Sequence, residues 1–199
     1  MIVAAIAWSL VYSFSFFEAF ELIILMITRD FLLSGIVVAT VIWCATLASL
    51  SDSYQLTHVV VLARFLSNRL LVPLAPTSQY THISSSDSVE WAYAFDVHTN
   101  AFFPLFLTLY VAQLFLLPIV LRGEKDRQQN WVCMWVGNTL WAGGLGQYFY
   151  GIYLGLNALP FLTHSELLLT PLLPLLIGYV VSLLGFPIAR HVLGWYFGS

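Results

Sequence analysis

The residues best suited to chemistry gather in one stretch of the chain, residues 89–104, which reads VEWAYAFDVHTNAFFP. The polar members that we single out are Glu90, Tyr93, Asp96, His98 and Asn100. This polar stretch stands at the start of a long apolar run. Ionisable side chains are costly to place at a bilayer, so a group of them at this position indicates a structural or a functional task.

The spacing of the polar stretch separates its members if the segment is helical. Asp96 and Asn100 lie four residues apart and share a face, whereas His98 is rotated by about 200° from Asp96. Two interpretations follow. In the first, the polar groups hydrogen-bond to neighbouring helices and hold the span at its depth. In the second, they line a cavity at the membrane surface, where His98 and Asn100 donate hydrogen bonds to a lipid head group or to the backbone of a partner.

Neither a metal site nor a catalytic site is predicted. Asp96 and His98 point apart on a helix, and the other histidines show no HxxxH or ExxH spacing. The chain has no GxSxG, Walker-type or zincin motif, so we expect a non-enzymatic protein without a cofactor. The formal net charge of -3 and the lack of a basic run argue against nucleic-acid binding.

Composition indicates the class of protein. Hydrophobic residues make up 60% of the chain and charged residues 9%, whereas about a quarter of the residues of soluble domains are charged. Apolar runs of about twenty residues match the hydrocarbon core of a bilayer, in which helices satisfy their own backbone hydrogen bonds. We therefore predict an all-α polytopic membrane protein, one helical domain over residues 1–199. Its five transmembrane helices are predicted at about residues 2–17, 31–50, 102–121, 132–156 and 167–193.

Residues 51–101 separate the second and third predicted spans. Arg64 and Arg69 would each cost about 2.5 to 3.5 kcal/mol in the middle of a span. Residues 54–71 are therefore predicted to form an interfacial helix rather than a sixth span. Residues 73–88 combine prolines with a Ser/Thr-rich run, which is typical of a flexible linker.

The fourth predicted span carries polar and small residues. Asn138 and Gln147 are predicted to form hydrogen bonds between helices rather than to hold a substrate. Gly151 and Gly155 form a GxxxG pair, which allows the backbone of another helix to approach closely. We expect that partner to be another span of the same chain.

A tight turn is predicted between the fourth and fifth spans. The sequence NALPFLTH begins there at Asn157, and Pro160 is expected to end the fourth helix because proline cannot continue the helical hydrogen-bond pattern. We expect Asn157 and Pro160 to shape the turn rather than to take part in a reaction.

Three signatures carry a resemblance to a known family. They are YAFDVHTNAF at 93–102, NTLW at 138–141 and LGLNALPFL at 154–162. In this order and at roughly this spacing, they resemble the Unc-fifty (uncoordinated-fifty) family of Golgi-region membrane proteins. The resemblance is strong over residues 89–199, whereas residues 1–50 match mainly as two apolar spans.

The resemblance implies a role in vesicular traffic. It implies a multi-pass membrane protein of the Golgi or the early secretory pathway, with the inner nuclear membrane as the alternative location. The implied role is that of a scaffold or adaptor for a large Arf guanine-nucleotide exchange factor, which supports the delivery of membrane receptors to the cell surface. Lipid and this exchange factor are the expected partners.

A second class of function is a lipid-handling or small-solute transport protein, which would use the polar groups at the start of the third span. A transporter needs a continuous polar cavity that reaches the middle of the membrane. An adaptor needs only a closed bundle with an exposed cytosolic surface. The predicted spans show no inverted repeat, which favours the adaptor.

Two signals for the orientation disagree. One side of the predicted bundle holds Arg64 and Arg69, and the other holds Arg29, Arg122, Lys125, Arg127 and Arg190. The positive-inside rule places the second side in the cytosol, whereas the resemblance implies a cytosolic N-terminus, which we follow. Family members also begin with a basic segment ahead of the first span. We expect a chain without it to orient less uniformly and to recruit an exchange factor less well.

Overall fold

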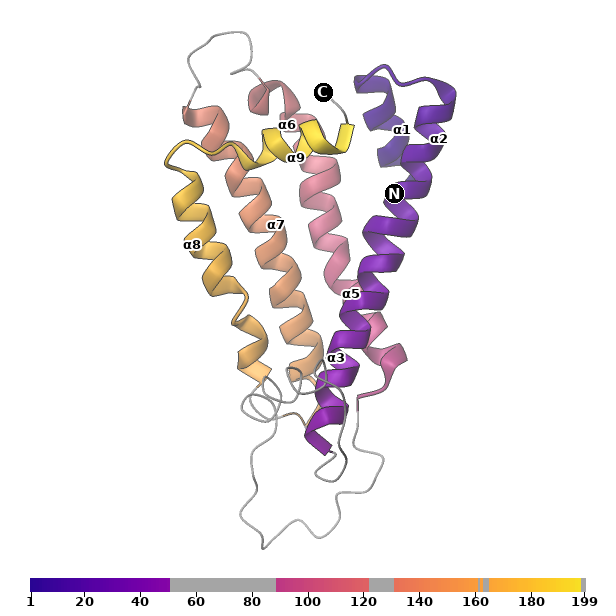
Figure 1. Cartoon of the computed structure of the whole chain (residues 1–199), viewed down its shortest axis with the longest axis vertical. Helices are drawn as coiled ribbons and strands as arrows, with labels where there is room; N and C mark the ends of the chain where they lie inside the picture. The colour runs from indigo at the N-terminus through magenta and orange to yellow at the C-terminus, as the bar shows by residue number, and fades with distance from the viewer. Residues whose placement is uncertain (51–88, 122–130, 161, 163–164, 198–199) are drawn as a thin grey trace, which may run out of the picture.

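The structure is a computed structural model, which describes residues 1–50, 89–121, 131–160, 162 and 165–197. The described residues form helices and contain no β-strand, which confirms the all-α class. The long helices lie side by side along one axis, and α9 crosses them near one end (Figure 1). The predicted interfacial helix and linker, residues 54–71 and 73–88, lie outside the described residues.

The first helix is shorter than predicted. α1 (Ile2–Val11) ends before a turn, and α2 (Phe16–Leu25) begins a new helix in place of the end of the predicted span. Ser15 caps α2, because its hydroxyl accepts a hydrogen bond from the backbone N–H of Glu18 while the Glu18 carboxylate accepts one from the Ser15 N–H. This capping box satisfies two donors at the helix start and fixes the new helix there.

A single rod follows the capping box. α2 continues through a π-helical segment, η1 (Met26–Leu33), into α3 (Ser34–Leu50). The prediction that the second span begins at residue 31, with Arg29 in the preceding loop, is therefore wrong. Arg29 lies within the rod. Its charge is tolerated there because it pairs with Asp30, which in turn accepts hydrogen bonds from the hydroxyls of Tyr110 and Tyr196.

The next rod also begins earlier than predicted. α5 (Trp91–Phe106) leads through a second π-helical segment, η2 (Leu107–Ala112), into α6 (Gln113–Val120). The polar stretch therefore forms the first turns of this rod rather than a loop ahead of residue 102. Pro104 lies inside α5 shortly before the π segment, where proline removes a regular backbone hydrogen bond.

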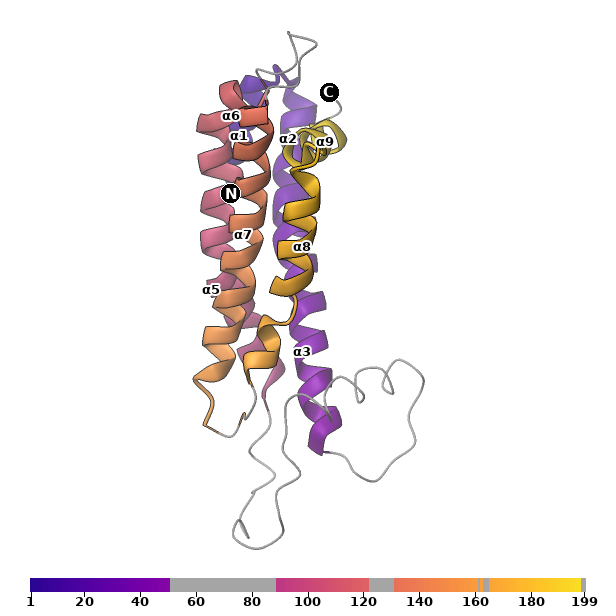
Figure 2. The same ribbon diagram turned by 90° about the vertical axis from the view of Figure 1, so that its left-hand side faces the viewer.

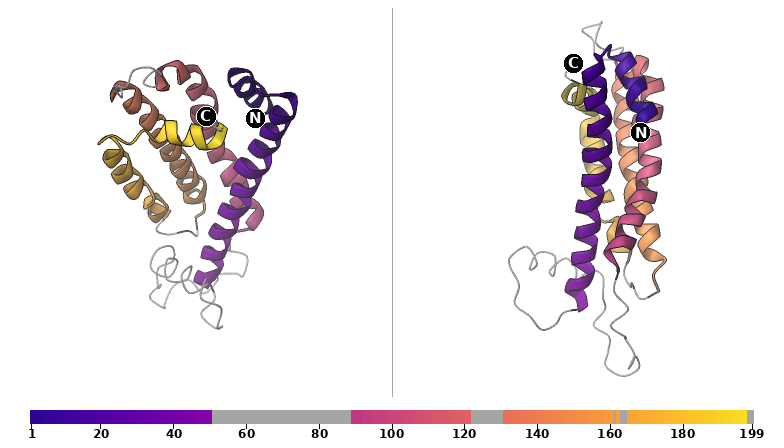
Figure 3. Two further views of the ribbon diagram at one scale, coloured as in Figure 1. Left: turned by 45° about the horizontal axis from the view of Figure 1, so that its top comes forward. Right: turned by 90° about the vertical axis from the view of Figure 1, so that its right-hand side faces the viewer.

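The last part of the chain departs from a simple fifth span. α7 (Trp131–Asn157) covers the range predicted for the fourth helix. After it come a 3-10 helix, η4 (Ser165–Leu169), then α8 (Leu172–Ser182) and α9 (Ile188–Phe197). A single helix over 167–193 is wrong, because Gly185 turns the chain with a φ of 131°, which favours glycine. α9 then runs across the end of the bundle (Figures 2 and 3).

Close packing of α5 on both neighbours forms the core. A Cβ atom at Gly155 of α7 would lie 2.7 Å from Cγ1 of Val97, and one at Gly151 would lie 3.0 Å from Cβ of Ala101. On the other side of α5, a Cβ atom at Gly35 of α3 would lie 2.6 Å from the His98 ring. The partner of the GxxxG pair is thus a helix of the same chain.

Two described helices are long and apolar enough to cross a membrane by length and composition, Phe16–Cys44 and Trp91–Val120, rather than the five predicted. α1 and α8 are apolar but have 10 and 11 residues. α7 has 27 residues, but it contains many glycine, tryptophan and tyrosine residues, which are less apolar than the leucine, isoleucine and valine of the other two helices. The outer surface nevertheless carries large apolar side chains such as Phe16, which is 82% exposed.

Candidate functional site

A nearly buried carboxylate joins three elements below α9. The Asp30 side chain, in η1, is 12% exposed. Its Oδ2 atom accepts a hydrogen bond of 2.9 Å from the hydroxyl of Tyr110 in η2 and another from the hydroxyl of Tyr196 in α9. Its Oδ1 atom accepts one from Nε of Arg29 at 2.8 Å. Because these donors come from different elements, the carboxylate holds two rods and α9 together.

Arg29 extends this polar cluster over the aromatic rings of α9. Its guanidinium carbon lies 4.7 Å from the centre of the Tyr196 ring and 5.7 Å from that of Trp195. These are cation–π distances, which fix the position of the guanidinium group. Burial raises the pKa of the Tyr196 phenol, and the hydrogen bond to Asp30 raises it further. The phenol therefore stays a donor to Asp30 throughout the physiological pH range.

The two π-helical segments face each other through this cluster, since Asp30 belongs to η1 and Tyr110 to η2. Each segment also receives a side-chain donor at a backbone carbonyl. The Trp8 indole donates to the Tyr110 carbonyl at 2.9 Å, and Nε2 of His98 lies 3.2 Å from the Phe31 carbonyl. π-helical turns often occur at functional sites, so this region is the strongest candidate of the described chain.

His98 forms a second polar contact between three elements. Its ring is fully buried, and Nδ1 lies 2.8 Å from the hydroxyl of Tyr148 in α7. A carbonyl can only accept, so Nε2 carries the hydrogen that faces Phe31, and in the neutral ring Nδ1 accepts from Tyr148. Phe31, Phe95 and Phe102 surround the ring. His98 therefore ties η1, α5 and α7 together inside the bundle.

A small cavity lies beneath α9, between Trp8, Gln113, Trp141 and Tyr196. Its volume of about 30 Å³ is enough for a water molecule. Nε2 of Gln113 and Nε1 of Trp141 are buried and have no hydrogen-bond partner among the described residues. A group that accepts hydrogen bonds would be stabilised at these two donors.

Asn138 ties α7 to the turn between α8 and α9. Its Nδ2 atom donates to the Ser182 hydroxyl and to the Phe186 carbonyl, both at 2.9 Å. Its Oδ1 atom accepts from the backbone N–H of Ile188 at 2.8 Å. The fully buried Asn138 side chain thereby satisfies the start of α9, where the first backbone N–H groups lack partners within the helix.

Replacement of Asn138 by alanine should destabilise this corner. It leaves the Ile188 N–H and the Phe186 carbonyl without the partners that Asn138 supplies, which costs about 1 to 3 kcal/mol for a buried group. We expect a thermal midpoint in detergent lower by roughly 2 to 12 °C, at about 2 to 4 °C per kcal/mol. The matched control is Gln147→Ala, because exposed Gln147 accepts one bond from Thr108 at 2.9 Å. Equal losses in both variants would contradict the assignment.

The structure does not bring the predicted polar stretch together as one internal cluster. Asp96 and Asn100 lie on the exposed side of α5, where the Asn100 amide donates to Asp96 at 3.2 Å. His98 lies on the buried side, because a step of two residues on a helix points to the opposite face. Glu90 is the exposed residue before α5 and makes no side-chain cap. The Tyr93 hydroxyl donates to the Gly155 carbonyl at 2.7 Å, which adds to the contact between α5 and α7.

The predicted turn after α7 contains both of its singled-out residues. Asn157 ends α7, and its Oδ1 atom accepts from the Ser165 hydroxyl at 2.5 Å. Pro160 follows in the exposed part of the turn. Neither of them lies near Asp30 in the described contacts, so this end of the bundle is separate from the candidate site.

Sequence reasoning missed the residues of the candidate site. Arg29 was counted only as a charge between the first two spans, Tyr196 was interpreted only as one of the aromatic rings at the span ends, and Asp30 and Tyr110 were not singled out. One signal was present: the pair Arg29–Asp30 lies in the middle of the long, mainly apolar helix from Phe16 to Cys44, and ionisable residues inside such a helix need partners. No group of three or more His, Cys, Asp or Glu side chains that could hold a metal occurs among the described residues.

Comparison with known proteins gives the family. The model of the UNC-50 family matches residues 1–197. The chain belongs to the UNC-50 family. The match thus covers both halves of the chain and is not restricted to residues 89–199.

Individual members of the UNC-50 family support this assignment. The chain is 34% identical to the "Protein GMH1 homolog" of Schizosaccharomyces pombe, over all of this chain and 72% of that protein. It is 34% identical to the "Protein unc-50 homolog" of Dictyostelium discoideum, over 100% and 64% of the two chains, and 33% identical to the human "Protein unc-50 homolog", over 98% and 59%. The chain therefore spans about three fifths to three quarters of the length of these relatives. No solved structure matches it.

Proposed function

We propose that this chain is a non-enzymatic, five-span membrane protein of the Golgi or the early secretory pathway. In this role it supports vesicular traffic as a scaffold or adaptor for a large Arf guanine-nucleotide exchange factor, and it aids the delivery of membrane receptors to the cell surface. Membership of the UNC-50 family is the observation that carries the proposal.

The arrangement of the helices supports a multi-pass bundle of four antiparallel rods, to which the proposal adds α1 as the fifth span. The rods α2–η1–α3 and α5–η2–α6 run in opposite directions, α7 runs against the second of them, and η4–α8 runs against α7 (Figures 1 and 2). α7 would be about 40 Å long at 1.5 Å per residue, which exceeds a hydrocarbon core of about 30 Å. α1, a shorter apolar helix of 10 residues, lies beside α2 at one end of the bundle.

Two cavities among the described residues give no support to a transport path. The larger one, about 360 Å³, lies between α7 and α8 and is lined mainly by apolar side chains such as Leu145, Leu175 and Ile188. The smaller one, beneath α9, is about 30 Å³. Neither of these two cavities forms a continuous polar path along the bundle. Because His98 is fully buried and Asp96 pairs with Asn100 on the outside, the start of α5 gives no support to a transport path.

Recruitment of the exchange factor tests the proposal. The full chain is placed in sealed microsomes, which expose the cytosolic face alone, and in nanodiscs, which expose both faces. We expect a purified large Golgi Arf exchange factor to bind both preparations, with at least ten-fold more bound to them than to matched membranes without the chain. Sedimentation measures binding to the microsomes, and a surface-coupled binding assay measures binding to the nanodiscs.

An orientation control accompanies this measurement. We expect residues 51–88 on the cytosolic side, so a glycosylation acceptor inserted near Lys125 should be modified in microsomes and one near Ser85 should not. Binding to nanodiscs alone would place the contact on the opposite face. An absence of binding to both preparations would overturn the scaffold role.

A further inference from the structure

α9 lies like a helix at a membrane surface. It runs across the bundle at the end where α6 ends and α7 begins, whereas the candidate spans run along it (Figure 3). It buries Ala189 and Leu193 against the bundle and exposes Arg190, His191 and Trp195. A helix with one apolar and one polar face that runs across the spans fits the interfacial layer.

Aromatic side chains mark the depth of this end of the bundle. The Trp195 side chain is 78% exposed, and Trp131 and Trp135 at the start of α7 are 57% and 43% exposed. The last two stack with ring centres 6.4 Å apart. Exposed tryptophan rings favour the head-group level of a bilayer, so α9 lies at the depth of the lipid phosphates.

Arg29 reaches this level from a different element. Its Nε atom is held by Asp30, and its guanidinium plane lies over the rings of Trp195 and Tyr196. The Arg29 side chain is nonetheless 37% exposed. The guanidinium is therefore fixed along one edge and one face, while its terminal N–H groups form a fork of the kind that binds phosphate oxygens in pairs.

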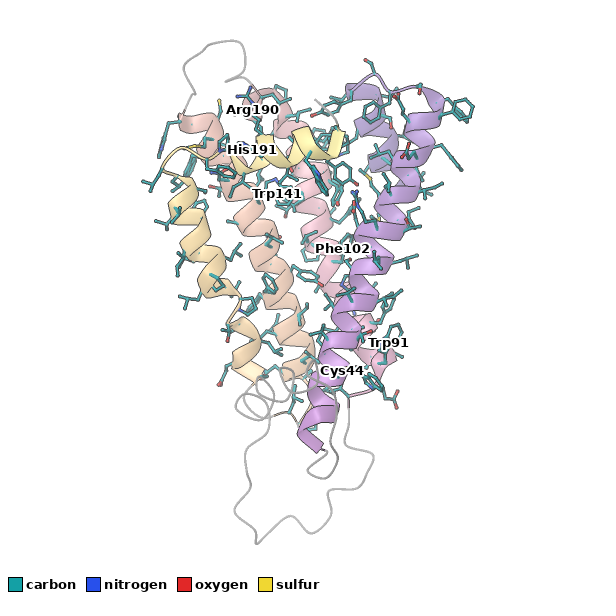
Figure 4. All side chains as sticks on the ribbon, viewed as in Figure 1. Cys44, Trp91, Phe102, Trp141, Arg190 and His191 are labelled. Carbon is teal, nitrogen blue, oxygen red and sulfur yellow. The ribbon has the colours of Figure 1, made fainter. Side chains whose placement is uncertain are left out.

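The described charges at this site are those of Arg29 and Asp30, which pair at 2.8 Å. The oxygens of Asp30 already accept bonds from Tyr110, Tyr196 and Arg29, and this side chain is mostly buried. Arg190 is exposed on α9, about one and a half turns before Trp195, on the same end of the bundle (Figure 4).

We propose that Arg29, held between Asp30 and the rings of α9, binds the phosphate group of a membrane phospholipid. The phosphate oxygens take the terminal N–H groups of Arg29, and the ring of Trp195 lies beside the glycerol region of the lipid. This inference rests on the proposed insertion into a membrane, but it is independent of the exchange factor.

Lipid-dependent thermal stability tests the site. The full chain is purified in dodecyl maltoside, which contains no phosphate, and its unfolding midpoint is measured with increasing dioctanoyl phosphatidylcholine or dioctanoyl phosphatidic acid. The matched lipid is dioctanoylglycerol, which has the same acyl chains without a phosphate. Inorganic phosphate is the soluble arm. We expect both phospholipids to raise the unfolding midpoint at concentrations at least ten-fold lower than those required of dioctanoylglycerol or inorganic phosphate.

Two variants assign the binding to this site. Arg29→Lys keeps a positive charge beside Asp30 but loses the planar fork, and we expect it to weaken phospholipid binding at least ten-fold, measured against its own lipid-free midpoint. Trp195→Ala removes an exposed ring that orients Arg29, and we expect a several-fold loss of phospholipid binding. This second variant keeps the test valid if Arg29→Lys does not fold. Arg69→Gln removes a basic residue from the segment between α3 and α5 and should bind as the unchanged chain does.

The other outcomes overturn the inference. Equal effects of dioctanoylglycerol would show a purely apolar contact, and equal effects of inorganic phosphate would show a free-anion site. Unchanged binding by both Arg29→Lys and Trp195→Ala would place the lipid elsewhere. Extraction of the chain from membranes by alkaline carbonate would instead contradict the proposed membrane insertion, so the two failures can be told apart.

Discussion

Replacement of Asp30 by alanine should cause a large loss of stability. The substitution leaves the hydroxyls of Tyr110 and Tyr196 and the Arg29 guanidinium without their shared acceptor. Arg29 is 37% exposed, so the main cost comes from the two hydroxyls, at about 1 to 3 kcal/mol for each unpaired group or about 2 to 6 kcal/mol together. For a chain of this size we expect a thermal midpoint lower by roughly 4 to 24 °C, at about 2 to 4 °C per kcal/mol. Differential scanning fluorimetry of the detergent-solubilised chain measures this loss.

Asp96→Ala is the matched control for this experiment. It also removes one carboxylate from a long rod, but Asp96 is exposed and its described contact is with Asn100 of the same helix. We expect a change within about 0.5 kcal/mol, as for most surface substitutions. Had Asp96 belonged to an internal polar cluster, its loss would cost about 1 to 3 kcal/mol. A midpoint equally low in both variants would contradict the structural placement of these two carboxylates.

Gly155→Ala should disrupt the contact between α5 and α7. The new Cβ atom would lie 2.7 and 2.8 Å from the two methyl carbons of Val97. Valine is branched at Cβ and has little rotamer freedom in a helix, so it cannot move aside. Overpacking of this kind costs about 1 to 3 kcal/mol. We expect an unfolding midpoint lower by roughly 2 to 12 °C, despite the higher helix propensity of alanine.

Gly146→Ala is the opposite case on the same helix. No atom lies within 4 Å of a Cβ atom at this position, so the substitution should be neutral or should stabilise α7 by up to about 1 kcal/mol. Val97→Ala combined with Gly155→Ala tests the contact itself. In the double variant, part of the loss should be recovered as a favourable coupling between the two sites. Losses that simply add would show that Gly155 acts through something other than Val97.

Helical structure and its approximate places were predictable because they depend on local composition. Long apolar runs predicted helices, and α7 covers almost the same residues as the fourth predicted span. The small residues Gly151 and Gly155 indicated a close helix contact, and the absence of a Cβ atom in glycine is a local property. The sequence pattern also carried the family resemblance, which the match over residues 1–197 shows.

The ends of the helices were less predictable. Hydropathy does not distinguish a single helix from two that meet in a short apolar turn. The capping box of Ser15 and Glu18 separates α1 from α2, and the positive φ of Gly185 lets the chain turn from α8 to α9. Conversely, the charge of Arg29 indicated a loop, but a continuous helix passes through it. A pair of charges ends an apolar span only where it finds no partner in the bundle.

The sequence by itself determined that this protein is built from apolar helices and which family it resembles. It also determined that Asp96 and His98 of the polar stretch lie on different faces of a helix. These properties follow from composition and from the helical repeat, which act over a few residues. Only the tertiary structure decided that the main polar site lies at Asp30. Tyr110 and Tyr196 are 80 and 166 residues away from it in sequence, and no local pattern records that three such distant groups share one carboxylate. Packing also decided that His98 is internal, because the missing side chain at Gly35 leaves room for its ring.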